Sequence, residues 1–281
     1  MKIARIRTAQ GVRPALQGED RLWRNAGSIV GDWTPNTIGT AEWETYRNQL
    51  AALPLIHHPH FEAPISRPGK IVCIGLNFTD HAREAEMAVP SEPVFFLKAP
   101  TSWCGPDADV WMPPGAEKLD WEIELAIVIG RHARHLPAAR AMDAVLGYTI
   151  MNDVSERASQ LERNGQWTKG KSYDRFAPAG PFIAMRDEVE DVSKLSMTLE
   201  VNGAARQQGS TANMIFDVAT VVSYVSQFMT LEPGDVISTG TPAGVALGHK
   251  PPLFLKAGDV MTLRIDGLGQ QRQRVTLGET R

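Results

Sequence analysis

The chain has 281 residues, of which 43% are hydrophobic and 22% are charged, and its formal net charge is -3. These values are ordinary for a globular protein and leave no surplus of positive charge, so we expect neither a nucleic acid nor a membrane as partner. The 24 glycines and 19 prolines favour a β-rich body with many turns. The chain starts without the apolar core of a secretory signal, and no stretch approaches the roughly 18 apolar residues of a membrane span, which predicts a cytoplasmic protein.

The first part of the chain is predicted to form a small N-terminal domain, residues 1–66, ahead of a main domain, residues 67–281. Residues 2–8 alternate between apolar and polar types, which predicts a strand, and residues 40–53 have a helical pattern. The stretch 57–70 is rich in proline, which restricts the backbone and removes hydrogen-bond donors. We therefore expect a linker there.

A histidine and a glutamate follow the first predicted strand of the main domain, the apolar run of residues 70–76. Asn77 is a suitable N-cap for a helix that would come next. On that helix His81 and Glu84 lie three residues apart and share a face, so the carboxylate could orient the imidazole as a base that activates water. On these residues alone, an incidental pair on a surface helix is the favoured interpretation, because the pattern is short.

Residues 120–130 carry two glutamates in the alternating pattern of a strand. Glu122 and Glu124 fall on one face, about 7 Å apart. The same face continues through Ala126 and Val128, where an unpaired charge would be costly, so a positive group should meet the acids. Two carboxylates at this spacing can share a hard divalent cation. An exposed edge strand with two solvated acids is the other interpretation, and this stretch does not separate the two.

A third acid, Asp153, ends the apolar run of residues 145–153, which predicts a second buried strand. We expect a helix over residues 155–164, on which Arg157 and Gln160 share a face beside Asp153. Asp153 can be a metal ligand at the end of a strand, or it can cap this helix. Considered singly, capping is the favoured interpretation.

The second half of the chain contains further turns and one long helix. Residues 167–181 are dense in Lys, Gly and Pro, which predicts a loop where Lys171 is either solvated or reaches an anionic site. Asn202-Gly203 after an alternating run predicts a β-hairpin. Residues 211–229 have the apolar stripe of an amphipathic helix, and the loop 239–244 lets backbone approach a ligand closely.

Several stretches together resemble the fumarylacetoacetate hydrolase superfamily and cover most of residues 70–269 in the family's order. They are GLNFTDHAREAE, EPVFFLKA, DWEIELAIVIG, GYTIMNDVSERASQ, WTKGKSYDRFAPAGP, MIFDVATVVSYVSQFMTLEPGDVISTGTPAG and AGDVMTLRIDGLG. The resemblance implies an α+β, β-rich fold with a mixed β-roll or sandwich core behind a small N-terminal domain, and a homodimer. It also implies one Mg²⁺ or Mn²⁺ ion per chain, held by Glu122, Glu124 and Asp153.

The same resemblance assigns roles around this ion. His81 and Glu84 match a catalytic HxxE pair on a lid-like segment, and Lys171 matches the lysine of a GKS loop. The matching substrate-binding residues are Arg157, Gln160 and Thr241. Phe78 stands where many members have tyrosine, so this chain departs from the family pattern there.

The implied reaction is hydrolysis of the C3–C4 bond of a 2,4-dioxo acid, a 3-acylpyruvate, to pyruvate and a carboxylic acid. Water activated by His81 and Glu84 would attack the 4-oxo carbon. Resemblance to one branch makes 2,4-diketo-3-deoxy-L-fuconate the substrate to test first. Oxaloacetate decarboxylation and fumarylpyruvate or homoprotocatechuate-pathway hydrolysis or isomerisation would use the same site. A non-catalytic metal-dependent binder of keto acids is the alternative of another class, and the intact HxxE pair argues against it.

Overall fold

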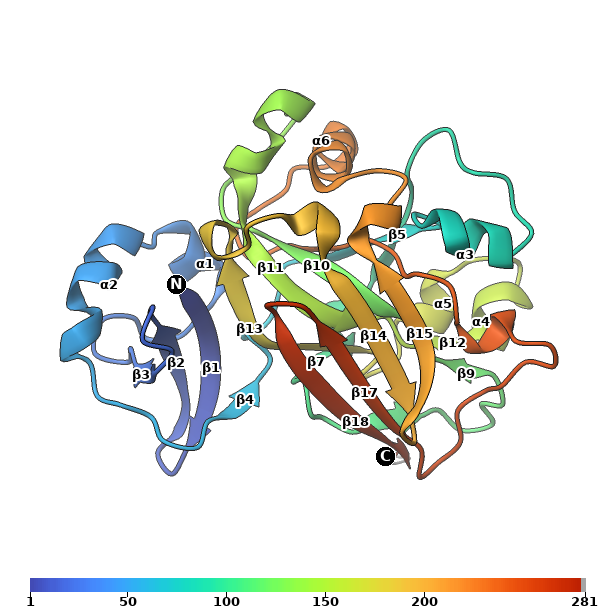
Figure 1. Cartoon of the computed structure of the whole chain (residues 1–281), viewed down its shortest axis with the longest axis horizontal. Coiled ribbons are helices and arrows are strands. Elements are labelled where there is room, and N and C mark those ends of the chain that lie inside the picture. Colours follow the sequence, from blue (N-terminus) through green and yellow to red (C-terminus); the bar gives the residue numbers. More distant parts are fainter. Residues whose placement is uncertain (279–281) are drawn as a thin grey trace.

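The computed structural model of the protein describes residues 1–278, and their strands form two packed sheets and one small two-stranded sheet (Figure 1). In spatial order, the larger sheet contains β3 (Trp23–Asn25), β2 (Gly11–Gln17), β1 (Lys2–Thr8), β13 (Ala177–Met185), β11 (Val145–Asn152), β10 (Ile123–Ile129), β16 (Val236–Ser238), β5 (Ile71–Gly75) and β6 (Val94–Lys98). Two more of its strands are β4 (His60–Glu62), which pairs with β1, and β7 (Trp103–Cys104), which pairs with β13.

The smaller sheet lies against the middle of the larger one, where β14, β17 and β18 contact β10, β11 and β13. Its strands, in spatial order, are β15 (Ala204–Ser210), β14 (Ser196–Val201), β17 (Val260–Ile265), β18 (Gly269–Leu277) and β8 (Val110–Met112). The two-stranded sheet consists of β12 (Ser155–Glu156) and β9 (Leu119–Asp120). The predicted α+β, β-rich class is therefore confirmed.

The helices are short. They are α1 (Pro35–Gly39), α2 (Trp43–Gln49), α3 (Thr79–Glu84), α4 (Arg157–Leu161), α5 (Thr168–Lys171) and α6 (Val218–Phe228). The 3₁₀ segments are η1 (Leu50–Ala52), η2 (Pro100–Ser102), η3 (Ala138–Ala144), η4 (Arg186–Glu188), η5 (Val192–Lys194), η6 (Thr211–Asn213) and η7 (Ala246–Gly248). Among residues 1–278, no helix combines the length and the apolarity needed to cross a membrane.

Strand β10 has two different faces, as its alternating sequence predicts. It lies between β11 and β16 and is buried along its whole length, so it is no exposed edge strand. Ile127 and its neighbours two residues away join the hydrophobic cluster shared with the smaller sheet. Ala126 and Val128 join a second cluster on the opposite side of the sheet. The face that carries the acids therefore continues into a hydrophobic interior.

The N-terminal segment is built onto the main body. Strand β1 pairs with β13 through Lys2 and Ile3, so the strands of residues 1–66 extend the larger sheet (Figure 1). Ile3 and Leu16 also share a buried cluster with Ile71 of β5. The division of the chain at residue 66, the homodimer and the cytoplasmic location stay predictions.

Three predicted elements have different boundaries. The predicted loop 167–181 contains α5 and the first residues of β13. The helix expected over 155–164 is only α4, because Ser155 and Glu156 pair with β9 instead. The helix expected over 211–229 begins at Val218, where the side chain of Asp217 accepts a hydrogen bond from the backbone N–H of Thr220 and caps it.

The predicted cap of α3 was wrong, whereas the predicted hairpin is confirmed. Phe78 is the N-cap residue of α3. The Asn77 side chain instead bridges two loops: its amide donates to Thr239 O and Phe216 O, and its oxygen accepts from Phe216 N. β14 and β15 are joined by Asn202-Gly203, whose positive φ angles of 53° and 78° suit these two residues.

Replacing Ile127 by alanine should lower the free energy of unfolding by about 2–5 kcal/mol, because its fully buried side chain fills the space between the two sheets. The matched control is Leu277→Ala on β18, where a 72% exposed side chain should change stability by no more than about 0.5 kcal/mol. Urea unfolding followed by fluorescence measures both. Equal effects of the two substitutions would contradict the described core.

Candidate active site

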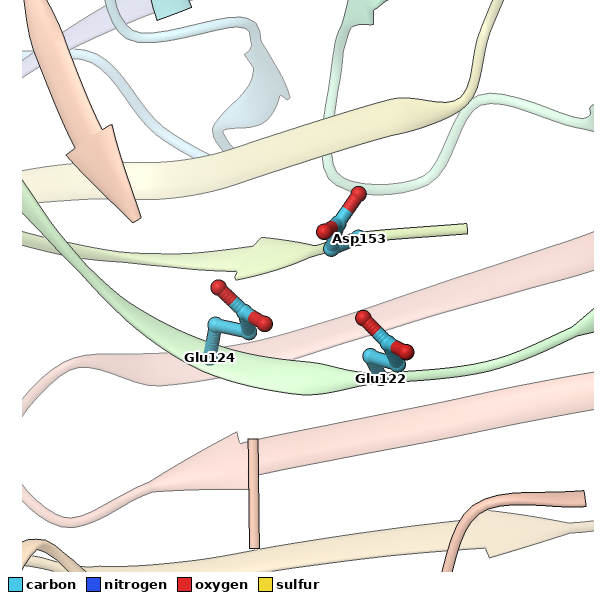
Figure 2. A group of neighbouring side chains, drawn as sticks. All are labelled: Glu122, Glu124 and Asp153. Atoms are coloured by element: carbon cyan, nitrogen blue, oxygen red, sulfur yellow. The ribbon is translucent and has the colours of Figure 1, made fainter. Parts of the chain in front are cut away.

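Three carboxylates from neighbouring strands meet inside the protein. Glu122 directly precedes β10, Glu124 lies in it, and Asp153 directly follows β11. Backbone pairing places them together, since Asp153 N donates to Glu122 O at 2.9 Å. One oxygen from each carboxylate lies within 4.8 Å of the others, and all three residues are buried. Figure 2 shows Glu122 and Glu124 side by side at the start of β10 and Asp153 beside them at the end of β11, the grouping that the family resemblance implied.

Two buried lysines compensate these acids. Lys171 Nζ at the end of α5 lies 2.6 Å from Glu122 Oε2 and 2.8 Å from Asp153 Oδ2. Lys98 Nζ at the end of β6 lies 2.5 Å from Asp153 Oδ1 and donates to Val154 O at 3.1 Å. Burial lowers the pKa of Lys171, but the charges of Asp153 and Glu122 outweigh burial and raise it. Lys171 is therefore a buried ammonium and not a solvated loop lysine, and Asp153 is not a helix cap.

An arginine joins the acids to α4. Arg157 Nη2 donates to Glu122 Oε1 at 2.5 Å, Nε to Asp120 Oδ2 at 2.8 Å, and Nη1 to Gln160 Oε1 at 2.9 Å. Arg157 and Gln160 thus share a face of α4, as predicted. Burial lowers the pKa of Arg157, but Asp120 and Glu122 outweigh burial and raise it. Two of the three substrate-binding candidates, Arg157 and Gln160, therefore lie at the acidic cluster.

Glu124 differs from its neighbours because it has no cationic partner among the described residues. It accepts hydrogen bonds from Ser238 Oγ at 2.5 Å and Gly240 N at 3.0 Å. Burial, together with the nearby charges of Asp153 and Glu122, raises its pKa well above the ordinary value. The pKa of Glu122 falls to about 2, because Lys171 and Arg157 outweigh the effect of burial. Glu124 is thus the member of the cluster whose negative charge most lacks compensation.

The charges and donors of this cluster fit a divalent metal ion. Its buried charged residues are the acids Asp120, Glu122, Glu124 and Asp153 and the cations Lys98, Arg157 and Lys171. If all are ionised, one negative charge is left over, in an interior where uncompensated charge is costly. Carboxylate oxygens are the ligands that Mg²⁺ and Mn²⁺ prefer. The residues present therefore suit the ion that the sequence predicted.

A histidine–glutamate pair faces the acids. His81 Nδ1 lies 3.0 Å from Glu84 Oε2, and Glu84 Oε1 accepts a hydrogen bond from Gly244 N at 2.9 Å. Burial raises the pKa of Glu84, but the hydrogen bonds from His81 and Gly244 outweigh burial and lower it. The ionised carboxylate orients the imidazole through Nδ1 and leaves Nε2 to act on another molecule.

A cavity of about 60 Å³ is lined by all the predicted site residues except Glu84. Glu84 contacts His81, which lines the cavity. Its polar lining consists of His81, Glu122, Glu124, Asp153, Arg157, Gln160, Lys171 and Thr241. Thr241 is held in place, since its Oγ1 donates to Ile123 O and accepts from Gln207 Nε2, each at 2.8 Å. Wider hollows of about 230–360 Å³ exist elsewhere on the described surface, but these buried acids do not line them.

Sequence reasoning missed two charged members of the cluster. Lys98 lies in the stretch EPVFFLKA and received no role from the sequence, and no local pattern shows that it meets Asp153, 55 positions away. Asp120 could have been found, because it stands two residues before Glu122 and four before Glu124, so the alternation places all three on one face.

Replacing Lys98 by methionine should lower the free energy of unfolding by about 3–5 kcal/mol, because it leaves one oxygen of buried Asp153 without its cation. The control is Lys118→Met, which removes an exposed ion pair with Glu162 and should cost no more than about 1 kcal/mol. Chemical unfolding at neutral pH measures both variants. A loss below 1 kcal/mol for Lys98→Met would show that Asp153 does not depend on this lysine.

Comparison with known proteins gives this geometry a context. Residues 70–276 match the family model described as Fumarylacetoacetate (FAA) hydrolase C-terminal. A protein of Burkholderia orbicola (strain MC0-3), provisionally named a hydrolase without a stated substrate, is 52% identical over 277 residues, which are 98% of each chain. The fumarylacetoacetate hydrolase of Exiguobacterium antarcticum has a similar structure, with a TM-score of 0.87 and 36% identity over 99% of this chain and 100% of the other.

Two further solved structures differ in the activity that they are named for. Maleylpyruvate hydrolase of Sphingobium sp. SYK-6, in complex with manganese(II) and pyruvate, has a TM-score of 0.82 and 28% identity over 99% of this chain and 100% of the other. A 2-hydroxyhepta-2,4-diene-1,7-dioate isomerase of Mycobacterium marinum has a TM-score of 0.77 and 34% identity over the full length of both chains. With a family match over most of its length and a shared fold along all of it, the chain belongs to the fumarylacetoacetate hydrolase family, whose members here include hydrolases and isomerases.

Proposed function

We propose that the protein is a metal-dependent hydrolase that cleaves the C3–C4 bond of a 2,4-dioxo acid, giving pyruvate and a carboxylic acid. The observation that carries this proposal is the shared cavity: the imidazole of His81 and the three carboxylates of Glu122, Glu124 and Asp153 line one small space. A base that activates water and a site for a divalent cation are the two elements that this reaction needs.

The pyruvate end of the substrate is assigned to the cationic part of the cavity. A bound Mg²⁺ or Mn²⁺ would polarise the 2-oxo group and stabilise the negative charge that develops there. Lys171 and Arg157 are charged and buried at the same place, so they favour an anionic carboxylate nearby. Gln160 is oriented by Arg157 and offers its remaining amide hydrogens to substrate oxygens.

The acyl end is assigned to the space in front of His81. In the proposed step His81 Nε2 takes a proton from water, and the resulting hydroxide attacks the 4-oxo carbon. The C3–C4 bond then breaks, its electron pair passes to C3 and the adjoining 2-oxo group as an enolate, and the acyl carbon leaves as the carboxylic acid. Return of the proton from His81 to C3 gives pyruvate. Glu84 keeps the imidazole in place and stabilises its protonated form.

The maleylpyruvate hydrolase structure supports the pyruvate half of this proposal, since it is named as holding manganese(II) and pyruvate together. The acyl group is proposed from sequence alone, and 2,4-diketo-3-deoxy-L-fuconate is the first substrate to test. The isomerase of Mycobacterium marinum, at 34% identity, favours a second candidate function, isomerisation of an unsaturated 2-hydroxy diacid at the same site. Oxaloacetate decarboxylation is a third, because it needs the same enolate and no attacking water.

Replacing His81 by alanine should lower kcat/KM for acylpyruvate hydrolysis by about 10²- to 10⁴-fold, the usual contribution of a general base. Binding of Mn²⁺, followed by electron paramagnetic resonance, should stay at one ion per chain, because the imidazole is not part of the carboxylate cluster. His57→Ala, which changes an exposed histidine, is the matched control and should affect neither measurement. Asp153→Asn should lose Mn²⁺ binding. Undiminished turnover of His81→Ala would refute the role of His81 as the base.

A substrate panel separates the candidate functions. We expect release of pyruvate and one equivalent of carboxylic acid from 3-acylpyruvates, activity that disappears after chelation, and recovery with Mg²⁺ or Mn²⁺. Release of CO₂ from oxaloacetate alone would favour the decarboxylase. An absorbance change of an unsaturated 2-hydroxy diacid without bond cleavage would favour the isomerase. Tight, metal-dependent binding of every keto acid without turnover would favour a non-catalytic binder.

A further inference from the structure

Asp120 is a fully buried acid that is not one of the three carboxylates grouped as a metal site, and Arg157 connects it to Glu122, which is one of them. Its side chain accepts four hydrogen bonds. Oδ1 accepts from Trp121 N at 2.7 Å and from Ala246 N at 2.6 Å. Oδ2 accepts from Arg157 Nε at 2.8 Å and from Leu247 N at 3.1 Å. Each oxygen thus serves two donors.

One of these contacts fixes the part of the site assigned to pyruvate. Through Nε, Asp120 sets the plane of the Arg157 guanidinium, whose other nitrogens donate to Glu122 and Gln160. A guanidinium is rigid and planar, so holding one edge determines where the other edges point. The orientation of Glu122 Oε1 and of the Gln160 amide therefore depends on a carboxylate that touches neither of them.

Two further contacts, from the N–H groups of Ala246 and Leu247, fix the part of the site assigned to the base. Ala246 and Leu247 begin η7, and N–H groups at the start of a helical turn have no backbone acceptor within the turn. A carboxylate can accept hydrogen bonds from such groups. The same loop contributes Gly244 N, which donates to Glu84 Oε1 at 2.9 Å. Glu84 in turn holds His81 Nδ1 at 3.0 Å. Asp120 is therefore connected to the imidazole through one loop and one carboxylate.

We propose that Asp120 is a positioning residue that holds the metal-and-pyruvate half and the base half of the site in register. This inference rests on the proposed function, because that function assigns one half of the site to pyruvate and the other to the base. The hydrogen bonds that connect Asp120 to both halves can be tested without measuring turnover. One carboxylate sets the distance between Arg157 and the loop 244–248, so it sets where the imidazole lies relative to Glu122.

Only a carboxylate can make this connection. An asparagine at position 120 has one accepting oxygen, and its amide nitrogen would face N–H donors whichever way the group flips. If the amide oxygen faces Arg157 and Leu247, the amide NH₂ group faces the N–H groups of Trp121 and Ala246, and two donors then oppose each other. In the reverse orientation the NH₂ group faces Arg157, and the hydrogen bond to Arg157 is lost. The substitution keeps the volume and removes the charge, so its effect reports the connection and not a cavity.

The test compares Asp120→Asn with Asp235→Asn in the full chain. Asp235 is equally buried and accepts hydrogen bonds from Lys70 N and Glu232 N, at the opposite end of the β10–β16 pair. In Asp120→Asn, the amides of Ala246 and Leu247 should exchange with solvent roughly 10- to 100-fold faster, the range given by a hydrogen bond to a charged group. The ¹⁵N imidazole signal of His81 should shift as well. Asp235→Asn should change neither.

Kinetics provide the second measurement. Asp120→Asn should lower kcat and raise KM together, with kcat/KM down about 10- to 100-fold, because both halves of the site lose their orientation. His81→Ala, by contrast, should lower kcat alone. A purely structural role would lower stability and leave the kcat and KM of the folded protein unchanged.

A second variant covers the case in which Asp120→Asn does not fold. Ala246→Pro removes one of the N–H groups that Asp120 accepts, at the first position of η7, where proline is compatible with the backbone. It should shift the His81 signal in the same way while leaving Asp120 unchanged. Unaltered exchange at Leu247 and an unaltered His81 signal in the folded variants would overturn the proposal. If the wild-type chain hydrolyses no acylpyruvate, the proposed function fails, but exchange and the His81 signal still decide the connection.

Discussion

The cost of negative charge in a buried interior is the constraint on which the rest of the site depends. Four carboxylates lie fully or almost fully buried close together, three of them lining one small cavity, and only three cations accompany the four. Separating such charges from water costs several kcal/mol for each ion, so each acid must be met by a close partner. Lys98, Lys171 and Arg157 meet three of the acids, and Glu124 is left with a hydroxyl and a backbone N–H. An additional cation at this place would therefore complete the charge balance of these buried residues.

Strand β10 satisfies this constraint and the packing of the core with one alternating sequence. Its odd-numbered residues fill the space toward the smaller sheet, and its even-numbered residues run from the acids into the second hydrophobic cluster. A slip of one residue would place Glu122 and Glu124 in the core between the sheets, so register is strongly specified here. The positions of the acids and the stability of the sheet are for that reason inseparable.

This double role explains how much of the site could be predicted. The period-2 pattern places Glu122 and Glu124 on one face, and the end of an apolar run places Asp153 at a strand terminus. The positions of the carboxylates could therefore be predicted from local sequence. Those of their cations could not, since Lys98 and Lys171 come from β6 and α5, and pairing with Asp153 depends on how distant segments pack. The prediction of a loop over residues 167–181 was partly wrong for the same reason. Local composition favours turns there, but the end of this stretch belongs to β13, because that strand pairs with β11 and β1.

The same arrangement explains why family membership indicates how the 2-oxo end of the substrate is treated but does not identify the group at its other end. Hydrolysis, isomerisation and decarboxylation of 2-oxo acids all place negative charge near the 2-oxo group. In each of the proposed reactions the buried carboxylates, the lysines and Arg157 would act at that end of the substrate. What differs is the group attached at C3 and whether water can reach it. We assign that part of the site to the α3 segment with His81 and to the loop 244–248, which holds Glu84, and both segments are less buried than β10. Substrate choice is therefore expected to vary through these two segments while the acidic interior stays the same.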